Sequence, residues 1–150
     1  MGILDDKNTK ILEILKNHAD FSTRQIAKKL NLPITTVHNR IKKLRQEGFI
    51  RKFTIELDYK KTEQNFVSYV LISANLHILK QKHKTQYDLA KELKKLYCVE
   101  RVDIISGGTD LIAIIRVKDV EEFDNVLLEK IQLIEGIEKT QSLIVIHGTE

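Results

Sequence analysis

The sequence predicts an α+β fold in two domains: an N-terminal three-helix helix-turn-helix domain and a C-terminal ferredoxin-like β-α-β-β-α-β domain with an antiparallel sheet. Three observations support this prediction. Apolar residues recur at helical spacing up to Gly48, they then alternate with polar residues from Phe53 to Asp58, and strand and helix patterns follow one another to the C-terminus. At 150 residues, the chain has room for one ordinary domain or two small ones.

Three helices with recognisable ends are predicted first. One covers residues 4–18, and Ser22, followed three residues later by a glutamine, begins the second with the spacing of a capping box. Asn31–Pro33 is a predicted turn, because asparagine tolerates left-handed geometry and proline cannot extend the preceding helix. A third helix begins at Thr35, and Gly48 supplies the C′ position that follows its end. Two short helices joined by a tight turn form a helix-turn-helix.

The third predicted helix has one apolar face, formed by Val37, Ile41 and Leu44. Its opposite side carries short hydrogen-bonding side chains and cations, with no acid before Glu47. This combination suits a helix that lies in the major groove of double-stranded DNA.

The excess positive charge of the chain lies in its first domain. Residues 1–58 contain 12 Lys and Arg against 7 Asp and Glu, a net of +5, whereas residues 59–150 contain 13 against 14, a net of −1. Taken alone, the basic cluster at residues 40–52 fits a solvated helix face as well as a nucleic-acid surface. His38 either reaches DNA or packs at the flank of its helix.

The candidate DNA contacts fall into three groups. Groove contacts are assigned to Thr35, Thr36, Asn39 and Lys43, with Asn39 as the best candidate for bidentate recognition of adenine. Phosphates are assigned to Arg40, Lys42, Arg45, Arg51 and Lys52. Further backbone contacts are assigned to the start of the second helix, at Ser22, Thr23 and Arg24.

The pattern changes after Gly48. Residues 49–58 predict a strand, the polar segment 59–65 a linker, and residues 66–150 a second domain. Its elements are predicted as strands 66–76, 99–106, 111–117 and 137–146 and helices 85–96 and 120–131. This order is that of a ferredoxin-like fold.

Several of these strands are apolar on both sides, as residues 111–115 and 143–146 illustrate. A sheet that is apolar on both faces must be covered on both, and helices of this chain account for one face only. A second copy of the chain related by a twofold axis is the simplest cover, so a homodimer is predicted. Twofold symmetry in turn predicts a palindromic DNA site.

Other classes of protein are disfavoured by the composition. One cysteine, Cys98, excludes an intramolecular disulfide and a multi-cysteine zinc site, and the five histidines lack metal-binding spacing. The sequence holds no nucleophile elbow, P-loop or dinucleotide fingerprint, so neither an enzyme nor a cofactor is predicted. No apolar run approaches the roughly 20 residues that span a bilayer, and no signal-peptide pattern is present, so we expect a cytoplasmic protein without a membrane partner.

Several motifs occur in a recognisable order. They are Leu4-Asp5 with Ile11-Leu12, Ile26-Ala27, Val37-x-x-Arg40-Ile41-Lys42-x-Leu44-x-x-x-Gly48-x-Ile50, Gly107-Gly108-Thr109-Asp110 and Thr140-Gln141-Ser142-Leu143-Ile144-Val145. Together they resemble the Lrp/AsnC family, the feast/famine transcriptional regulators of bacteria and archaea. The resemblance implies a DNA-binding domain, a hinge strand, and a ferredoxin-like domain that dimerises and often assembles further, to tetramers or octamers. In many members that domain binds an amino acid or a related small effector between subunits.

The resemblance also implies an effector pocket. Its predicted residues are Gly107, Gly108, Thr109, Asp110, Thr140 and Ser142. The alternative is that the two glycines only form a hairpin turn. The chain departs from the family at Pro33 and Ile34, where a serine-led cap is more frequent, and at Ser142, where many members have threonine.

Two other functions remain open from the sequence. Some haem-pathway decarboxylases look built on the same two-domain frame, so a tetrapyrrole (siroheme-type) decarboxylase is one alternative, against which the basic third helix argues. An architectural protein that coats DNA with little sequence preference is the other. The ratio of specific to random DNA affinity separates it from a regulator.

Overall fold

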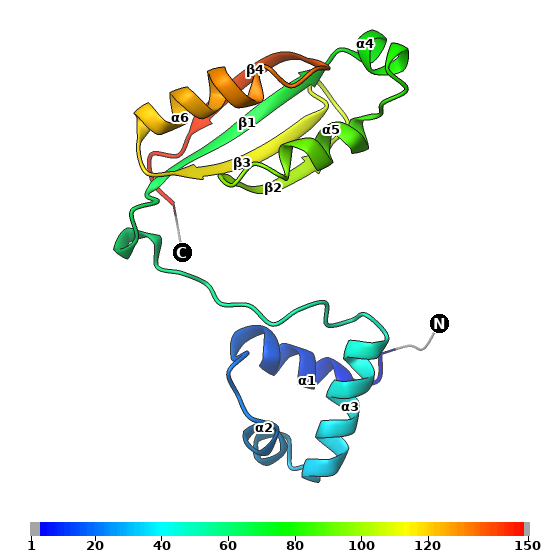
Figure 1. Cartoon of the computed structure of the whole chain (residues 1–150). Helices are drawn as coiled ribbons and strands as arrows, with labels where there is room; N and C mark the ends of the chain where they lie inside the picture. Colours follow the sequence, from blue (N-terminus) through cyan, green and yellow to red (C-terminus); the bar gives the residue numbers. More distant parts are fainter. Residues whose placement is uncertain (1–3, 149–150) are drawn as a thin grey trace. The chain divides into compact units, whose positions relative to one another are not determined.

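The computed structural model describes residues 4–148, and the chain divides between Leu57 and Asp58 into two compact units (Figure 1). Each unit has a separate cluster of buried apolar side chains. No helix within residues 4–148 is long and apolar enough to cross a membrane.

The N-terminal unit consists of three helices, as predicted: α1 (Asp6–Asn17), α2 (Thr23–Leu30) and α3 (Ile34–Gln46). Ile11, Ile26 and Val37, one from each helix, are fully buried where the helices meet. Helices this short are not stable alone in water, so this shared core holds the unit together.

The strand predicted over residues 49–58 is wrong. In the structure these residues form an irregular segment, and no strand within residues 4–148 pairs with them (Figure 1). A strand needs a neighbour for its backbone N–H and C=O groups, and alternating side chains alone do not supply one. Phe53, Ile55 and Leu57 are accordingly 46%, 78% and 46% exposed instead of facing a sheet.

The C-terminal unit has the predicted ferredoxin-like order. Its elements are the short 3-10 helix η1 (Tyr59–Lys61), β1 (Phe66–Ala74), α4 (Leu76–Gln81), α5 (Gln86–Leu93), β2 (Val99–Ile104), β3 (Leu111–Val117), α6 (Val120–Val126), the π-helical turn η2 (Leu127–Ile131) and β4 (Ile137–Ile144). The strands lie in the order β2-β3-β1-β4, and every neighbouring pair is antiparallel. Helix α4 was not predicted; Asn75 caps it by accepting a hydrogen bond from the Ile78 N–H at 3.1 Å.

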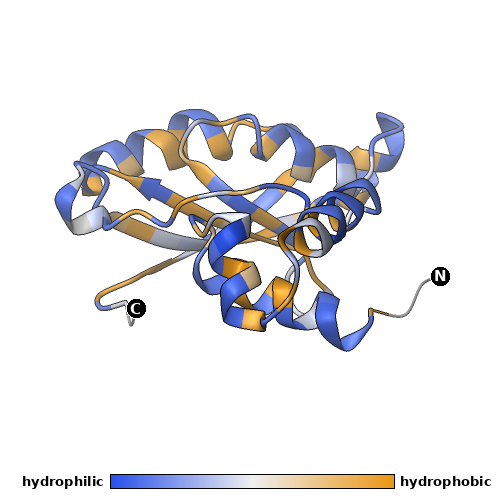
Figure 2. Ribbon diagram, turned by 90° about the horizontal axis from the view of Figure 1, so that it is seen from below, coloured by the Kyte–Doolittle hydropathy of each residue, from blue (hydrophilic) through white to orange (hydrophobic). Residues whose placement is uncertain are grey.

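Helices α5 and α6 cover one face of the sheet (Figure 1). Val70 and Ile72 of β1 and Ala113 and Ile115 of β3 are fully buried in the core that lies beneath them. The strand register places apolar residues on the other side of the sheet as well. Hydrophobic colour follows parts of the strands in Figure 2. We call this second side the open face. Its apolar side chains are Val67, Tyr69, Leu71, Ile112, Ile114 and Leu143.

Candidate nucleic-acid interface and effector pocket

The connection from α2 to α3 follows from local geometry. Ser22 caps α2 in the predicted capping box, and its hydroxyl and N–H both contact the Gln25 side chain, at 2.7 and 2.8 Å. Asn31 ends α2 in the left-handed conformation (φ 52°), as its place in the turn predicted. Pro33 then precedes α3 without a side-chain cap, because it has no hydrogen-bonding side chain to offer.

Helix α3 exposes most, but not all, of its predicted contact residues. Val37 and Leu44 are 0% and 1% exposed, and Gly48 ends the helix with a φ of 78°. Thr35 and Asn39 are exposed and lie one turn apart along the helix. The remaining predicted residues of α3 divide by exposure: His38, Lys42, Lys43 and Arg45 are exposed, whereas Thr36 and Arg40 are partly buried.

Arg40 is engaged inside the N-terminal unit rather than presented as a free phosphate ligand. One guanidinium nitrogen donates to both carboxylate oxygens of Asp5, at 2.8 and 2.6 Å, and to the Asn8 side-chain oxygen at 2.8 Å. The backbone N–H of Asn8, and next the Arg40 guanidinium, hold the pKa of the Asp5 carboxyl below its usual range. This contact ties the start of α1 to α3, so Arg40 is a positioning residue for α3.

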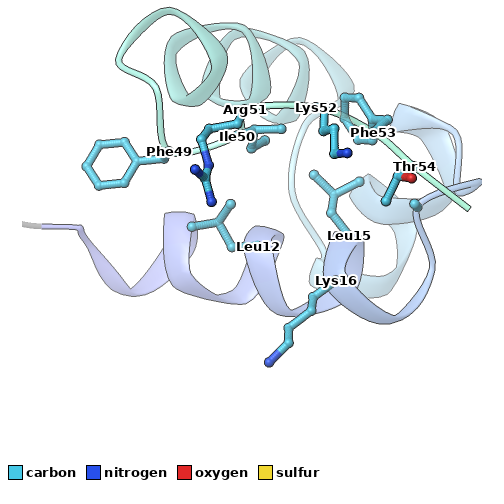
Figure 3. Close-up of a pocket in the computed structure, with 10 residues that line it drawn as sticks. Leu12, Leu15, Lys16, Phe49, Ile50, Arg51, Lys52, Phe53 and Thr54 are labelled. Atoms are coloured by element: carbon cyan, nitrogen blue, oxygen red, sulfur yellow. The ribbon is translucent and has the colours of Figure 1, made fainter. Parts of the chain in front are cut away.

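Arg51 and Lys52 lie at a groove between α1 and residues 49–54, which we call the α1 groove (Figure 3). It has a volume of about 670 Å³ and an apolar floor that includes Leu12 and Leu15. Arg51 extends toward α1 in Figure 3, and Lys16 of α1, which was not among the predicted residues, adds a third cation to the lining. The predicted phosphate contacts are thus split: Lys42 and Arg45 lie on α3, and Arg51 and Lys52 on the α1 groove.

The other end of the chain contributes a smaller cavity on the open face of the sheet. It measures about 340 Å³ and is lined by Leu71, Ser73, Gly108, Thr109, Lys139 and Gln141. We call it the sheet pocket. Of the six predicted effector residues, Gly108 and Thr109 line it. The Thr109 hydroxyl also donates to the Ile72 carbonyl at 2.9 Å, which fixes the hairpin against β1.

The other predicted effector residues have different positions. Asp110 connects β1 and α5, because its carboxylate oxygens accept hydrogen bonds from the Ala74 N–H at 2.8 Å and from the Gln86 side-chain amide at 2.7 Å. Thr140 pairs with Ile72 and Ser142 with Val70, so both side chains lie on the helix-covered side of β4. The structure therefore does not bring Thr140 and Ser142 into the sheet pocket with Gly108. Lys139 and Gln141, their neighbours in sequence, line the sheet pocket instead.

Among residues 4–148, no group of three or more His, Cys, Asp or Glu side chains is arranged so that it could hold a metal ion. Cys98 is buried before β2, and this burial raises the pKa of its thiol. A buried, protonated thiol is a poor nucleophile and a poor metal ligand.

Comparison with known proteins assigns both units. A model of the Lrp/AsnC ligand binding domain matches residues 70–149, and a model of winged helix-turn-helix DNA-binding domains matches residues 4–51. The HTH-type transcriptional regulator FL11 of Pyrococcus furiosus is 35% identical over 145 residues, which are 97% of this chain and 91% of that protein. The HTH-type transcriptional regulator PH1916 of Pyrococcus horikoshii is 34% identical over 95% of this chain and 92% of its own length.

Solved structures share the fold over nearly the whole chain. The structure of Escherichia coli AsnC superposes with a TM-score of 0.84 at 23% identity, covering 98% of this chain and 95% of that one. The transcriptional regulator NMB0573 of Neisseria meningitidis, solved as a complex with L-Met, superposes with a TM-score of 0.87 at 19% identity, covering 99% and 93%. These matches do not favour the decarboxylase or architectural alternatives.

Proposed function

This chain belongs to the Lrp/AsnC family of DNA-binding transcriptional regulators, and from that premise we propose that α3 reads a specific DNA sequence while the sheet pocket binds a small effector. The exposed side of α3 carries this proposal: from Thr35 to Arg45 it presents hydroxyls, an amide and cations without one acidic side chain.

Base reading is assigned to the residues of α3 that point away from the core. Asn39 offers the amide donor and acceptor that match the N7 and N6 edge of adenine. Thr35, Thr36 and Lys43 flank it on the same helix, and His38 is exposed beside it. Lys42 and Arg45 neutralise phosphates, and Arg51 and Lys52 do so only where DNA reaches the α1 groove.

The beginning of α2 supplies the remaining backbone contacts. Thr23 and Arg24 are the proposed phosphate ligands there, since Arg24 is exposed. Ser22 contributes less than predicted, because its hydroxyl already binds Gln25. Arg40 acts through its contact with Asp5, by holding α3 in place.

We propose that the regulator is a twofold dimer formed through the open face. Tyr69 and Leu143 pair directly across β1 and β4 and are 42% and 46% exposed, so an apolar patch lies at the middle of an uncovered sheet. Leu143→Asp is expected to give a monomer in sedimentation analysis. Leu133→Asp, at a residue 74% exposed outside the sheet, is the matched control and is expected to leave the dimer intact.

The effector is the remaining part of the proposal. The Neisseria relative was solved with L-Met, which supports an amino acid or a related small molecule as the class of ligand. In this chain the sheet pocket is the cavity of the C-terminal unit that suits such a molecule, because it combines one apolar wall with several polar side chains.

Selection of bound sequences from a random DNA pool tests the regulator. We expect a palindromic consensus, bound about 10³-fold or more tightly than random DNA at the same salt concentration. A ratio near one would contradict sequence-specific reading and support an architectural protein. A visible-absorption titration with a tetrapyrrole, run beside a gel shift on DNA, tests the alternative function of a decarboxylase.

A further inference from the structure

Helix α3 begins with an exposed isoleucine. Ile34 is 47% exposed, and within the helices of residues 6–46 it is the one large apolar side chain that remains exposed. It belongs neither to the buried cluster of the N-terminal unit nor to the partly buried side chains that pack against that cluster. Core packing therefore gives no reason for an apolar side chain at this position.

The stability of the helix gives no reason either. Isoleucine is β-branched, and its helix propensity is lower than that of alanine or leucine. Pro33, which precedes α3, makes no side-chain cap hydrogen bond, so no capping side chain reaches over the first turn. The Ile34 side chain is thus accessible at the start of α3, and an apolar group exposed to water is stabilised when another molecule covers it.

The surroundings of Ile34 suit contact with DNA. The first turn of α3 contains no acidic residue, and His38, one turn further along the same side of the helix, is exposed. In helix-turn-helix proteins, the N-terminal residues of the recognition helix contact base edges in the major groove. Asn39, the proposed reader of adenine, is ~7.5 Å from Ile34 along the helix axis, or about two base-pair steps of DNA.

The base edges of the major groove offer isoleucine one kind of partner. Its side chain has no hydrogen-bond donor or acceptor, so it cannot pair with the polar groups that adenine, guanine and cytosine present there. Thymine alone presents a methyl group, at C5, and apolar side chains contact this group. Burial of one such methyl group tightens a complex about fourfold.

We propose that Ile34 reads a thymine of the DNA site through apolar contact with its C5-methyl group. This inference rests on the proposed function of α3 and names a second base that the helix recognises. The spacing of the two side chains along α3 places this thymine within about three base pairs of the adenine that Asn39 binds. Together, the two residues favour A·T pairs at two places in each half-site.

Replacement of single thymines by uracil tests the contact directly, because uracil pairs with adenine as thymine does and lacks only the C5-methyl group. Duplexes of the selected DNA site, each with one thymine replaced, compete for the full-length protein in fluorescence anisotropy at one salt concentration. We expect one position in each half-site at which loss of the methyl group weakens binding about fourfold. Uracil at the other thymines is expected to have a smaller effect.

Three variants assign this methyl effect to a residue. Ile34→Ala keeps a good helix former at the position and is expected to abolish the effect, so that the thymine and uracil duplexes bind equally. Ile34→Val retains a branched apolar side chain and is expected to preserve it. Thr35→Ser removes a methyl group from the neighbouring exposed residue and is the matched control, for which we expect no change. Circular dichroism, sedimentation and affinity for random DNA are expected to be the same for all three.

Several outcomes would overturn the inference. They are the absence of a methyl-sensitive thymine near the adenine assigned to Asn39, a methyl effect that persists in Ile34→Ala, and loss of the effect in Thr35→Ser. A monomeric Ile34→Ala protein would place the side chain at a subunit interface instead. Specific binding without a methyl effect contradicts only the reading of thymine, whereas equal affinity for selected and random DNA contradicts the proposed function of α3 as well.

Discussion

Gly136, just before β4, occupies a position that only glycine fits without strain. Its φ is 102°, and a Cβ built on it would lie 2.4 Å from Leu79 Cδ2 and 3.2 Å from Leu79 Cγ. Leu79 is 3% exposed, so it has little room to move aside. The Gly136 carbonyl also accepts a hydrogen bond from the Asn75 N–H at 2.8 Å, which fixes the backbone on both sides of the contact.

We expect Gly136→Ala to lower the free energy of unfolding of the C-terminal unit by about 2–6 kcal/mol. A non-glycine residue at such a φ costs about 1–3 kcal/mol, and overpacking against a buried side chain costs about 1–3 kcal/mol more. Leu79→Ala alone removes a buried side chain and costs about 2–5 kcal/mol. The double variant is expected to lose about 1–2 kcal/mol less than the sum of the two, because the contact between the new methyl group and Leu79 is then absent.

Urea unfolding followed by tyrosine fluorescence measures this effect selectively. The four tyrosines, at positions 59, 69, 87 and 97, all lie in the C-terminal unit, and the chain has no tryptophan. Gly108→Ala is the control, expected within about 0.5 kcal/mol of the parent protein because a Cβ there meets open space. Equal unfolding midpoints for the Gly136 and Gly108 variants would refute the reasoning.

Three further predictions concern the N-terminal unit. Asn39→Ala is expected to cost about 1–3 kcal/mol at one base pair of the selected site, and equal losses on specific and random DNA would exclude base reading. Lys43→Ala is expected to weaken binding to all sequences and reduce the slope of log K against log salt by about one phosphate; an unchanged slope argues against it. The folded pKa of Asp5 is lowered by the Asn8 N–H and by Arg40, so its contribution to stability is present above its unfolded pKa of about 3.9 and is lost as pH falls through the folded value. Asp5→Asn, which keeps the helix cap, is expected to reduce stability at pH 6 but not in strong acid. Urea unfolding at both pH values measures this. A loss of stability that is equal at both would point to the cap instead of the charge.

Local rules were sufficient for most of the elements. Three helix-end signals were predicted in this way: the capping box at Ser22, the left-handed Asn31 and the glycine after α3. Each depends on residues that are at most four or five positions apart in the sequence, so the sequence alone determines which groups meet. The same rules failed where an element was too short to show a period. Helix α4 has only the six residues Leu76–Gln81, fewer than two turns, and its cap at Asn75 was the one signal that marks it.

Long-range pairing explains the remaining differences. The strand predicted at residues 49–58 has the right alternation but lacks a partner strand in residues 4–148. Thr140 and Ser142 were assigned to the pocket, but a shift of one residue along a strand moves a side chain to the other face. That parity follows from the register of β4 on β1, in which Ser142 lies opposite Val70, and no motif in the sequence shows it.

The number of cations available to DNA also depends on contacts between residues far apart in the sequence, so counting charges overestimates it. This difference can be measured. The sequence offers six cations within residues 40–52, but Arg40 is bound to Asp5, and Arg51 and Lys52 lie at the α1 groove. Exposed cations on α3 then number three, Lys42, Lys43 and Arg45, or six in a dimer. The proposed phosphate ligand Arg24 of α2 adds two contacts per dimer. At about 0.9 per phosphate, eight contacts give a slope of log K against log salt of about −7, whereas all six cations of residues 40–52 together with Arg24, in both copies, give about −13. The salt dependence of binding to the selected palindrome distinguishes the two. A slope near −13 would mean that Arg40 leaves Asp5 and that the α1 groove meets DNA.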